Sequence, residues 1–347
     1  MGCCETKNKN LIIVEDKIKE YIEQGNLSSL RSIHALITKS DKDFDINTIL
    51  YPIDETLSVC PLGLSLLLGH ADIFKAILQE MNGDFSLMES QFSEAETSGL
   101  SIICLNNYLV LLQVYLPLFL NSKKEQNLSP KTKNTRQTIY LDAKEELEQI
   151  LPCTYTPIQL AVENGHISIV NLLRSFVCSL NLIPSEIDLN YIEENTGNNS
   201  ALIACKENDF KMIKFLHCQC QADFNIVNNF SENAINILAI GSKNKCVETF
   251  KCLEYLIEKI QVDLVYNYQE TLMMLEEPEA LGYFEKKLCE NGINVTKKDL
   301  ELQGMVKPQK KTVCVANETG NRFTFTRIFP ELIKTPKESM LSSDNFA

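Results

Sequence analysis

The chain has 347 residues, of which 44% are hydrophobic and 23% charged, a composition typical of a folded soluble protein rather than a disordered one. This length exceeds one ordinary globular core, so we expect two domains or an elongated array whose core grows by stacking. A formal net charge of -13 disfavours a nucleic-acid partner, because the summed field repels phosphate.

The first residues, MGCCETK, predict a lipid-anchor segment over residues 1–10. They fit the pattern Met-Gly-x-x-x-Ser/Thr, in which Gly2 accepts myristate after Met1 is removed and Thr6 supplies the small hydroxyl residue. The segment resembles the N-termini of dually acylated signalling proteins, and this resemblance implies palmitate on Cys3 and Cys4. A second acyl chain turns the weak binding of one myristate into stable anchoring.

The rest of the sequence predicts no other membrane contact. The apolar stretch Leu11–Val14 is too short for a signal peptide, and Glu15 follows it directly. The longest apolar run, Leu109–Leu120, is much shorter than the roughly 20 residues that cross a bilayer. We therefore expect the protein at the cytoplasmic face of a cellular membrane, the plasma membrane in particular, and in the cytoplasm if it is not acylated.

Helix-turn-helix units follow one another along the chain. Residues 16–36 predict a partly polar first unit, and further units begin at Cys60 and near Ser98. In each of them apolar residues recur at a spacing that places them on one face of each helix. The predicted turns of these three units lie at Gly25, Gly69 and Asn107.

The clearest unit, Thr156–Ser175, reads TPIQLAVENGHISIVNLLRS. Gly165 makes its turn, and the predicted core stripe of its second helix consists of Ile169, Val170, Leu172 and Leu173. Similar units begin near residues 199 and 233, the first of them with its predicted turn at Asn208, and a shortened one begins near 270. These units resemble the ankyrin repeat, whose period is about 33 residues.

The resemblance implies an all-α fold, an ankyrin-repeat solenoid of about six to seven irregular helix-turn-helix repeats with short β-hairpin links. Two short helices cannot bury their apolar faces alone, so neighbouring copies must cover them. Only the unit at Thr156 begins with Thr-Pro, and Gln159 stands where the family often has histidine. We therefore expect an array less regular and less stable than a consensus one.

The unit boundaries divide the chain further. We expect N-terminal ankyrin repeats over 11–120, a flexible insertion over 121–150 and C-terminal ankyrin repeats over 151–293. The insertion is polar, holds several lysines and contains Pro130. Residues 294–347 are predicted to be an extended or partly disordered tail, in which the alternation in KTVCVA and NRFTFTR is strand-like.

No catalytic, cofactor or metal site emerges from the residues, so we predict a protein that is not an enzyme and that has no small-molecule substrate. No phosphate-binding loop or nucleophile motif occurs. His70 and His166 follow turn glycines, where ankyrin repeats use them structurally. His217, Cys218 and Cys220 resemble a fragment of a zinc site, but no paired C-x-x-C supplies the remaining ligand, so we predict no metal there. The 13 cysteines are interpreted as reduced packing residues.

These features predict a membrane-tethered ankyrin-repeat scaffold that binds another protein and does not catalyse a reaction. By resemblance, ankyrin modules contact partners through hairpin tips and inner helices. Phe230, Tyr266 and Tyr268 lie just before predicted repeat starts, so we expect them to bind the partner; the alternative is packing between hairpins. An alternative function is a regulatory or inhibitory subunit docking on a cytosolic enzyme, with the insertion or tail as a pseudo-substrate.

Overall fold

A computed structural model of the chain describes the backbone of residues 2–54, 57–95, 97–128, 155–177, 183–242 and 248–302. Side chains are described from residue 13 onward in these ranges, except those of residues 124–128 and 302. The chain forms two compact units. Among the described residues, the first unit holds those up to 102 and 110–126, and the second holds 103–109, 127–128 and 155–302.

Short helices in pairs make up the first part of the chain. Its elements are α1 (Gly2–Glu23), α2 (Leu27–Ser40), the 3-10 helix η1 (Ile46–Thr48), strands β1 (Tyr51–Pro52) and β2 (Ser58–Val59), α3 (Pro61–Leu67), α4 (Ala71–Glu80), α5 (Phe85–Glu94), α6 (Gly99–Asn106) and α7 (Leu109–Leu128). The two strands pair antiparallel, with Tyr51 opposite Val59.

The same pairing continues from residue 157. The elements are α8 (Pro157–Glu163), α9 (Ile167–Val177), η2 (Ser185–Ile187), α10 (Ser200–Lys206), α11 (Phe210–Phe215), η3 (Leu216–Cys220), α12 (Ala234–Gly241), α13 (Thr249–Tyr255), η4 (Leu256–Ile260), α14 (Tyr268–Met274), α15 (Pro278–Glu290) and α16 (Lys297–Leu302). Both η3 and η4 are short π-helices that continue the helix before them.

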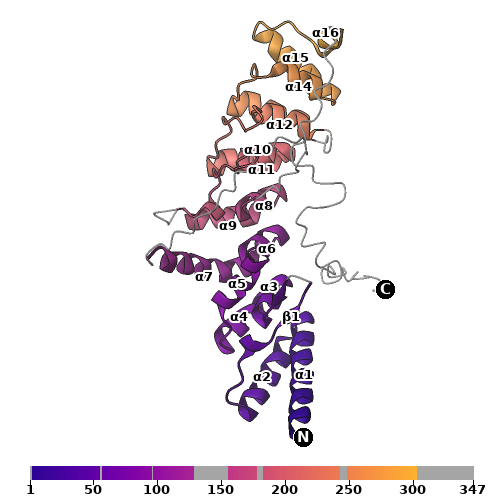
Figure 1. Ribbon diagram of the computed structural model, residues 1–347. Coiled ribbons are helices and arrows are strands. Elements are labelled where there is room, and N and C mark those ends of the chain that lie inside the picture. Colours follow the sequence, from indigo (N-terminus) through magenta and orange to yellow (C-terminus); the bar gives the residue numbers. More distant parts are fainter. Residues whose placement is uncertain are drawn as a thin grey trace, which may run out of the picture. The chain divides into compact units, whose positions relative to one another are not determined.

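The helices of the second unit stack in two rows. The first helices of successive pairs pack on one another in the order α8, α10, α12 and α14 (Figure 1). The second helices α11, α13 and α15 form the other row. The apolar side chains of α10 and α12 are almost wholly buried, as expected for helices that are hydrophobic all round. This arrangement confirms the predicted ankyrin-repeat solenoid.

Five of the predicted turns have the backbone geometry that their residues favour. Positive φ angles occur at Gly25, Gly69, Asn107, Gly165 and Asn208. Glycine adopts this left-handed region freely, and asparagine tolerates it better than most residues. The described residues contain seven helix pairs, in agreement with the six to seven repeats expected.

One residue of the predicted core lies at the margin. In α9 the side chains of Ile169, Val170 and Leu173 are buried, but Leu172 is half-buried. At 100° per residue the first three share one face of the helix, and Leu172 falls beside it. The predicted stripe was therefore one residue too wide.

Helix α7 corrects the predicted start of the insertion at 121. It continues to Leu128, because residues 121–128 include the good helix formers lysine, glutamate and glutamine. The remaining part of the predicted insertion, residues 129–150, lies outside the described residues. Helix α5 was not predicted; Asp84 caps it by accepting the backbone N–H groups of Ser86 and Leu87.

Helix α16 lies within the segment 294–347 that was predicted to be extended. Thr296 and Asp299 cap it reciprocally: the Thr296 amide donates to Asp299 Oδ2 at 2.8 Å and the Asp299 amide to Thr296 Oγ1 at 3.2 Å. Lys297 Nζ also donates to the carbonyl of Leu275 at 2.6 Å, which ties α16 to the end of α14. Residues from 303 lie outside the described part of the chain.

Within the described residues, no helix has both the length and the apolar character needed to span a membrane.

Candidate protein-binding edge of the second unit

Three successive links of the second unit form what we call the hairpin edge, residues 188–199, 223–233 and 263–267. Each begins with an aspartate whose Oδ1 accepts the backbone N–H two residues later: Asp188 from Asn190, Asp223 from Asn225 and Asp263 from Val265, at 2.9–3.0 Å. Such turns, made by a short side chain with its own backbone, fix the direction of the link.

Asparagine side chains join each link to the next. Asn199, the N-cap of α10, donates through Nδ2 to the carbonyl of Asp223 at 2.7 Å. Asn233, the N-cap of α12, makes the equivalent bond to the carbonyl of Asp263 at 2.8 Å. The Asp223 amide also donates to Asn190 Oδ1 at 3.1 Å. These bonds hold successive links in register.

The tips of the first two links also lock together. The Asn229 amide donates to the carbonyl of Thr196 at 3.0 Å, and its Nδ2 donates to the carbonyl of Glu194 at 2.9 Å. Gly197 between them has φ +74°, and a Cβ there would lie 2.6 Å from the Asn229 nitrogen. Backbone groups satisfied in this way make the links a stiff platform rather than mobile loops.

Exposed apolar side chains stand on this platform. Ile192, Val227 and Val265 are 53%, 47% and 43% exposed, one on each link. Ile192 and Val227 occupy the same position, the fourth residue after the leading aspartate. Exposed apolar groups that recur on neighbouring repeats are a feature of interaction surfaces.

Of the three side chains predicted to bind a partner, Phe230 and Tyr266 belong to this edge and Tyr268 directly follows it, and all three are half-buried. Phe230 follows Asn229 in the turn at the tip of the second link, and its amide donates to Asn228 Oδ1 at 3.0 Å. Tyr266 lies in the short third link, and Tyr268 is the first residue of α14. That link is too short to form a projecting tip, so the two tyrosines flank a tight turn.

The hairpin edge has a one-sided charge. Residues 183–205, 221–242 and 261–285 contain no lysine or arginine, whereas Asp188, Asp223 and Asp263 head the three links. Lysines of the second unit lie mainly on the other row of helices, for example Lys211 in α11 and Lys251 in α13.

The predicted lipid acceptors Gly2, Cys3 and Cys4 begin helix α1, and their side chains lie outside those described. Helix α1 is one continuous helix to Glu23. Ile18 and Ile22 are fully buried against the rest of the first unit, so the helix is fixed to the fold at this end.

The histidines have structural contacts. His166 Nε2 lies 3.0 Å from the carbonyl of Leu105, and the ring of His70 lies beside Gly25. His217 Nδ1 and Cys218 Sγ both contact the Tyr255 hydroxyl, at 3.0 and 3.1 Å. Burial and the bond with Cys218 raise the pKa of Tyr255 to about 12. No group of three metal-ligating side chains is found in the described ranges.

Four of the described cysteines lie in the core, as predicted, whereas Cys218 and Cys289 are exposed and Cys220 is half-buried. Cys60, Cys104, Cys205 and Cys252 are buried thiols without a disulfide. Burial raises the pKa of Cys252 to about 12, so the reactive thiolate is suppressed there. Cys178 lies outside the described residues.

Sequence reasoning missed the exposed residues Ile192, Val227 and Val265 because single apolar residues in links look unremarkable. The signal that could have located them is the triplet Asp–apolar–Asn, which begins the links at Asp188 and Asp223 and recurs at Asp45. At Asp45 it makes the same turn with the Asn47 amide.

Comparison with known proteins finds no matching family model and no matching curated protein. One similar solved structure is the ankyrin repeat domain of Bcl-3, with 15% identity, a TM-score of 0.46 and coverage of 76% of this chain and 96% of that one. Another is the human ASB11 ankyrin repeat domain, with 18% identity, a TM-score of 0.42 and coverage of 68% of this chain and 80% of that one. A third is the structure of a predatory endopeptidase from Bdellovibrio bacteriovorus in complex with an immunity protein, with 16% identity, a TM-score of 0.40 and coverage of 68% of this chain and 95% of that one. The stacked helix pairs and left-handed turns of this chain themselves identify its fold as an ankyrin-repeat solenoid.

Proposed function

We propose that this protein is a non-catalytic scaffold that binds a protein partner along the hairpin edge. The observation that carries the proposal is the recurrence of exposed Ile192, Val227 and Val265 on links held rigid by asparagine bonds. A stiff surface loses little conformational freedom on binding, so its apolar contacts contribute more to affinity. Half-buried aromatic residues beside them, such as Phe230, suit the role of anchor.

The test replaces Ile192, Val227 and Val265 together by serine. All three are substantially exposed, so the fold should survive, and thermal melts by circular dichroism should match those of the wild type. Partners that cross-link to the wild-type protein in cells should be recovered about tenfold less, because the buried apolar centre of the contact is lost. A second variant, Phe230→Ala with Tyr266→Ala and Tyr268→Ala, tests the aromatic residues in the same assay.

The first unit offers a matched control. Leu36, Leu50 and Val110 are 68%, 55% and 63% exposed, and their replacement by serine makes a similar chemical change on the first unit. This control should capture partners as the wild type does. Equal loss from both serine variants, or no loss from the edge variant, refutes the hairpin edge as the binding surface.

We propose further that acyl chains on Gly2, Cys3 and Cys4 tether the scaffold to a membrane. The support is the acceptor pattern with its paired cysteines and the placement of these residues at the start of α1. At 1.5 Å per residue, α1 would separate Gly2 from buried Ile18 by about 24 Å. The repeats would then stand at a set distance from the lipid, and fractionation of acceptor variants tests this tether.

A further inference from the structure

A buried polar residue follows the exposed apolar side chain in each of the first two links. Glu193 comes after Ile192 and Asn228 after Val227, and in both links the polar residue is the fifth after the leading aspartate. Glu193 is 0% exposed and Asn228 is 6% exposed, although the apolar residues before them are about half exposed. Each link therefore presents one apolar side chain to solvent and buries the polar side chain that follows it.

The carboxylate of Glu193 shapes the tip of the first link. Its Oε1 accepts the Asn195 amide at 3.1 Å, and its Oε2 accepts the amide and the hydroxyl of Thr196 at 2.6 and 2.7 Å. The Thr196 hydroxyl in turn accepts the Asn198 amide at 3.2 Å. A buried carboxylate is stable only where hydrogen-bond donors replace water. These bonds therefore fix the backbone from Glu193 to Asn198.

Asn228 has the equivalent role in the second link and also contacts the first. Its Oδ1 accepts the amides of Phe230 and Glu232 at 3.0 and 2.9 Å. Its Nδ2 donates to Glu232 Oε2 at 2.9 Å and to Asn198 Oδ1 at 3.1 Å. One buried amide group thus shapes the second tip and bonds to the link before it.

Thr196 is a second connection between the two tips. Its hydroxyl bonds to Glu193, and its carbonyl accepts the Asn229 amide of the second link at 3.0 Å. Loss of the Glu193 bonds should therefore loosen both tips, because members of one hydrogen-bond network depend on one another. The third link is built differently, since the fifth residue after Asp263 is Tyr268, which begins α14.

We propose that Glu193 is a positioning residue for partner binding. It holds the tips of the first two links in the conformation in which Ile192 and Val227 are presented together as one contact. Glu193 is fully buried and does not touch the partner; it acts through Thr196. The positioning role rests on the proposed function of the hairpin edge, whereas the coupling of the two tips does not.

Two substitutions at Thr196 test the coupling by hydrogen exchange of the full-length protein. Thr196→Val keeps the volume but removes the hydroxyl that bonds to Glu193, whereas Thr196→Ser keeps the hydroxyl and removes a methyl group. We expect the amides of Asn229 and Phe230 to exchange about tenfold faster in the valine variant and within about twofold of the wild type in the serine variant. A role in packing alone predicts the reverse order.

Glu193→Gln tests the carboxylate itself. The glutamine side chain offers one oxygen acceptor where the carboxylate offers two, so one set of bonds at the tip is lost. The same second-link amides should exchange about tenfold faster, while amides inside α12 keep the wild-type rate. Partners that cross-link to the wild type should be recovered about fivefold less, although Ile192 and Val227 are unchanged.

The matched control is Glu254→Gln. Glu254 is an exposed residue of α13 in the same unit, so this variant removes the same charge outside the hairpin edge. It should change neither the exchange of the second-link amides nor the recovery of partners.

Three results overturn the coupling of the tips. They are wild-type exchange of the second-link amides in Glu193→Gln, equal acceleration inside α12, and faster exchange in Thr196→Ser than in Thr196→Val. The positioning role fails if Glu193→Gln keeps its partners while the serine variant of Ile192, Val227 and Val265 loses them. If that serine variant keeps its partners as well, the proposed function of the edge is wrong.

Discussion

At the scale of single residues, Leu173 in α9 is a core side chain whose loss should be costly. It is fully buried between helices of the second unit, and Leu173→Ala should destabilise the protein by about 2–5 kcal/mol through the lost contacts and the cavity. The neighbouring Leu172 is half-buried and serves as the matched control, with a smaller expected loss of about 1 kcal/mol. Urea unfolding measures the loss of unfolding free energy in both variants. Equal losses would contradict the conclusion that Leu173 is a core side chain and Leu172 is not.

Gly197 is the residue on which the shape of the first link depends. Alanine there would combine a left-handed backbone with a Cβ 2.6 Å from the Asn229 nitrogen. Gly197→Ala should therefore cost about 1–3 kcal/mol. Gly282 lies inside α15 with nothing near its would-be Cβ, so Gly282→Ala should stabilise by about 0.5–1 kcal/mol. Thermal melts of the two variants should shift in opposite directions, and a neutral Gly197→Ala would mean that the link can relax.

Residue-level reasoning from the sequence went as far as periodicity allows. It located turns such as Gly165 and Asn208, because glycine and asparagine mark left-handed positions. It placed Tyr266 and Tyr268 on a projecting tip, which the short third link does not form. The length of a link depends on where the next helix begins, and periodicity alone does not fix that residue. It passed over Val227, whose exposure depends on how the link packs against its neighbours.

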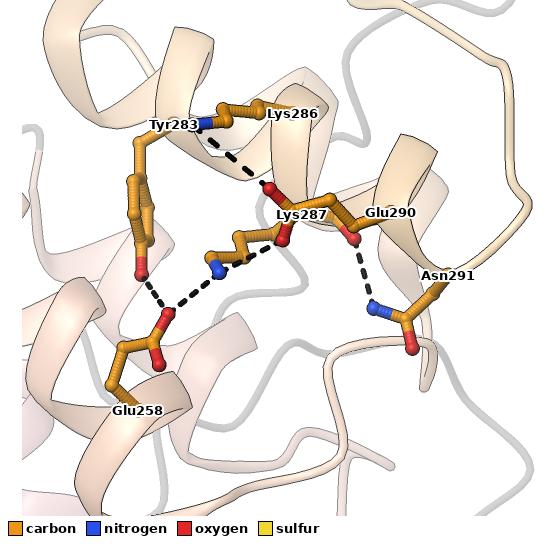
Figure 2. Close-up of polar contacts among 6 residues, drawn as sticks. All are labelled: Glu258, Tyr283, Lys286, Lys287, Glu290 and Asn291. Atoms are coloured by element: carbon orange, nitrogen blue, oxygen red, sulfur yellow. Dashed lines mark hydrogen bonds and ion pairs between the residues drawn. The ribbon is translucent and has the colours of Figure 1, made fainter.

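At the scale of elements, a polar network joins η4 to α15 and fixes the last repeat (Figure 2). Glu258 accepts from Lys287 Nζ at 2.7 Å and from the Tyr283 hydroxyl at 3.0 Å, and Lys287 also contacts Glu290 at 2.8 Å. The bonds from Lys287 and then Tyr283 lower the pKa of Glu258 below its ordinary value of 4.5. The ionised carboxylate is therefore favoured in the folded state.

This network predicts an acid-sensitive last repeat. A carboxylate whose folded pKa is lowered stabilises the fold above its unfolded pKa, and the contribution disappears as pH falls from about 4.5 through the folded pKa. Glu258→Gln should accordingly melt below the wild type at pH 7, and the gap should close as the pH falls below the folded pKa of Glu258. Hydrogen exchange of α15 amides measures the difference locally. A gap between the two proteins that stays constant with pH would exclude this role of Glu258.

Element boundaries show where sequence reasoning stops. The helix pairs were predicted because each has an apolar stripe around a turn, as in α3 and α4. Helix α5 escaped prediction, although Asp84 before Phe85 is an N-cap signal, because the expected repeat leaves no place for an additional helix. Helix α7 runs past its apolar part because helix propensity alone sustains the polar last turns.

At the scale of the whole molecule, stacked repeats give each pair stability only through its neighbours, and the array has no single central core. The two units can therefore differ in what they present. The second unit carries the hairpin edge, and the first carries α1 with the predicted lipid acceptors at its start. A scaffold of this kind would separate the surface that binds a partner from the segment that sets its location.

The tether is tested by two variants that should differ from each other. Gly2→Ala removes the myristate acceptor, and without that first weak membrane encounter Cys3 and Cys4 should rarely be palmitoylated, so the variant should become cytosolic. Cys3→Ser with Cys4→Ser keeps the single chain and should give partial, exchangeable binding, because one myristate supports an association constant on the order of 10⁴ per molar. The net charge of -13 gives anionic lipid little general attraction that could compensate. Membrane fractionation with intact-mass analysis measures both: if Gly2→Ala pelleted with membranes as fully as the wild type, or the native protein carried no acyl chain, the scaffold would not be tethered through this segment.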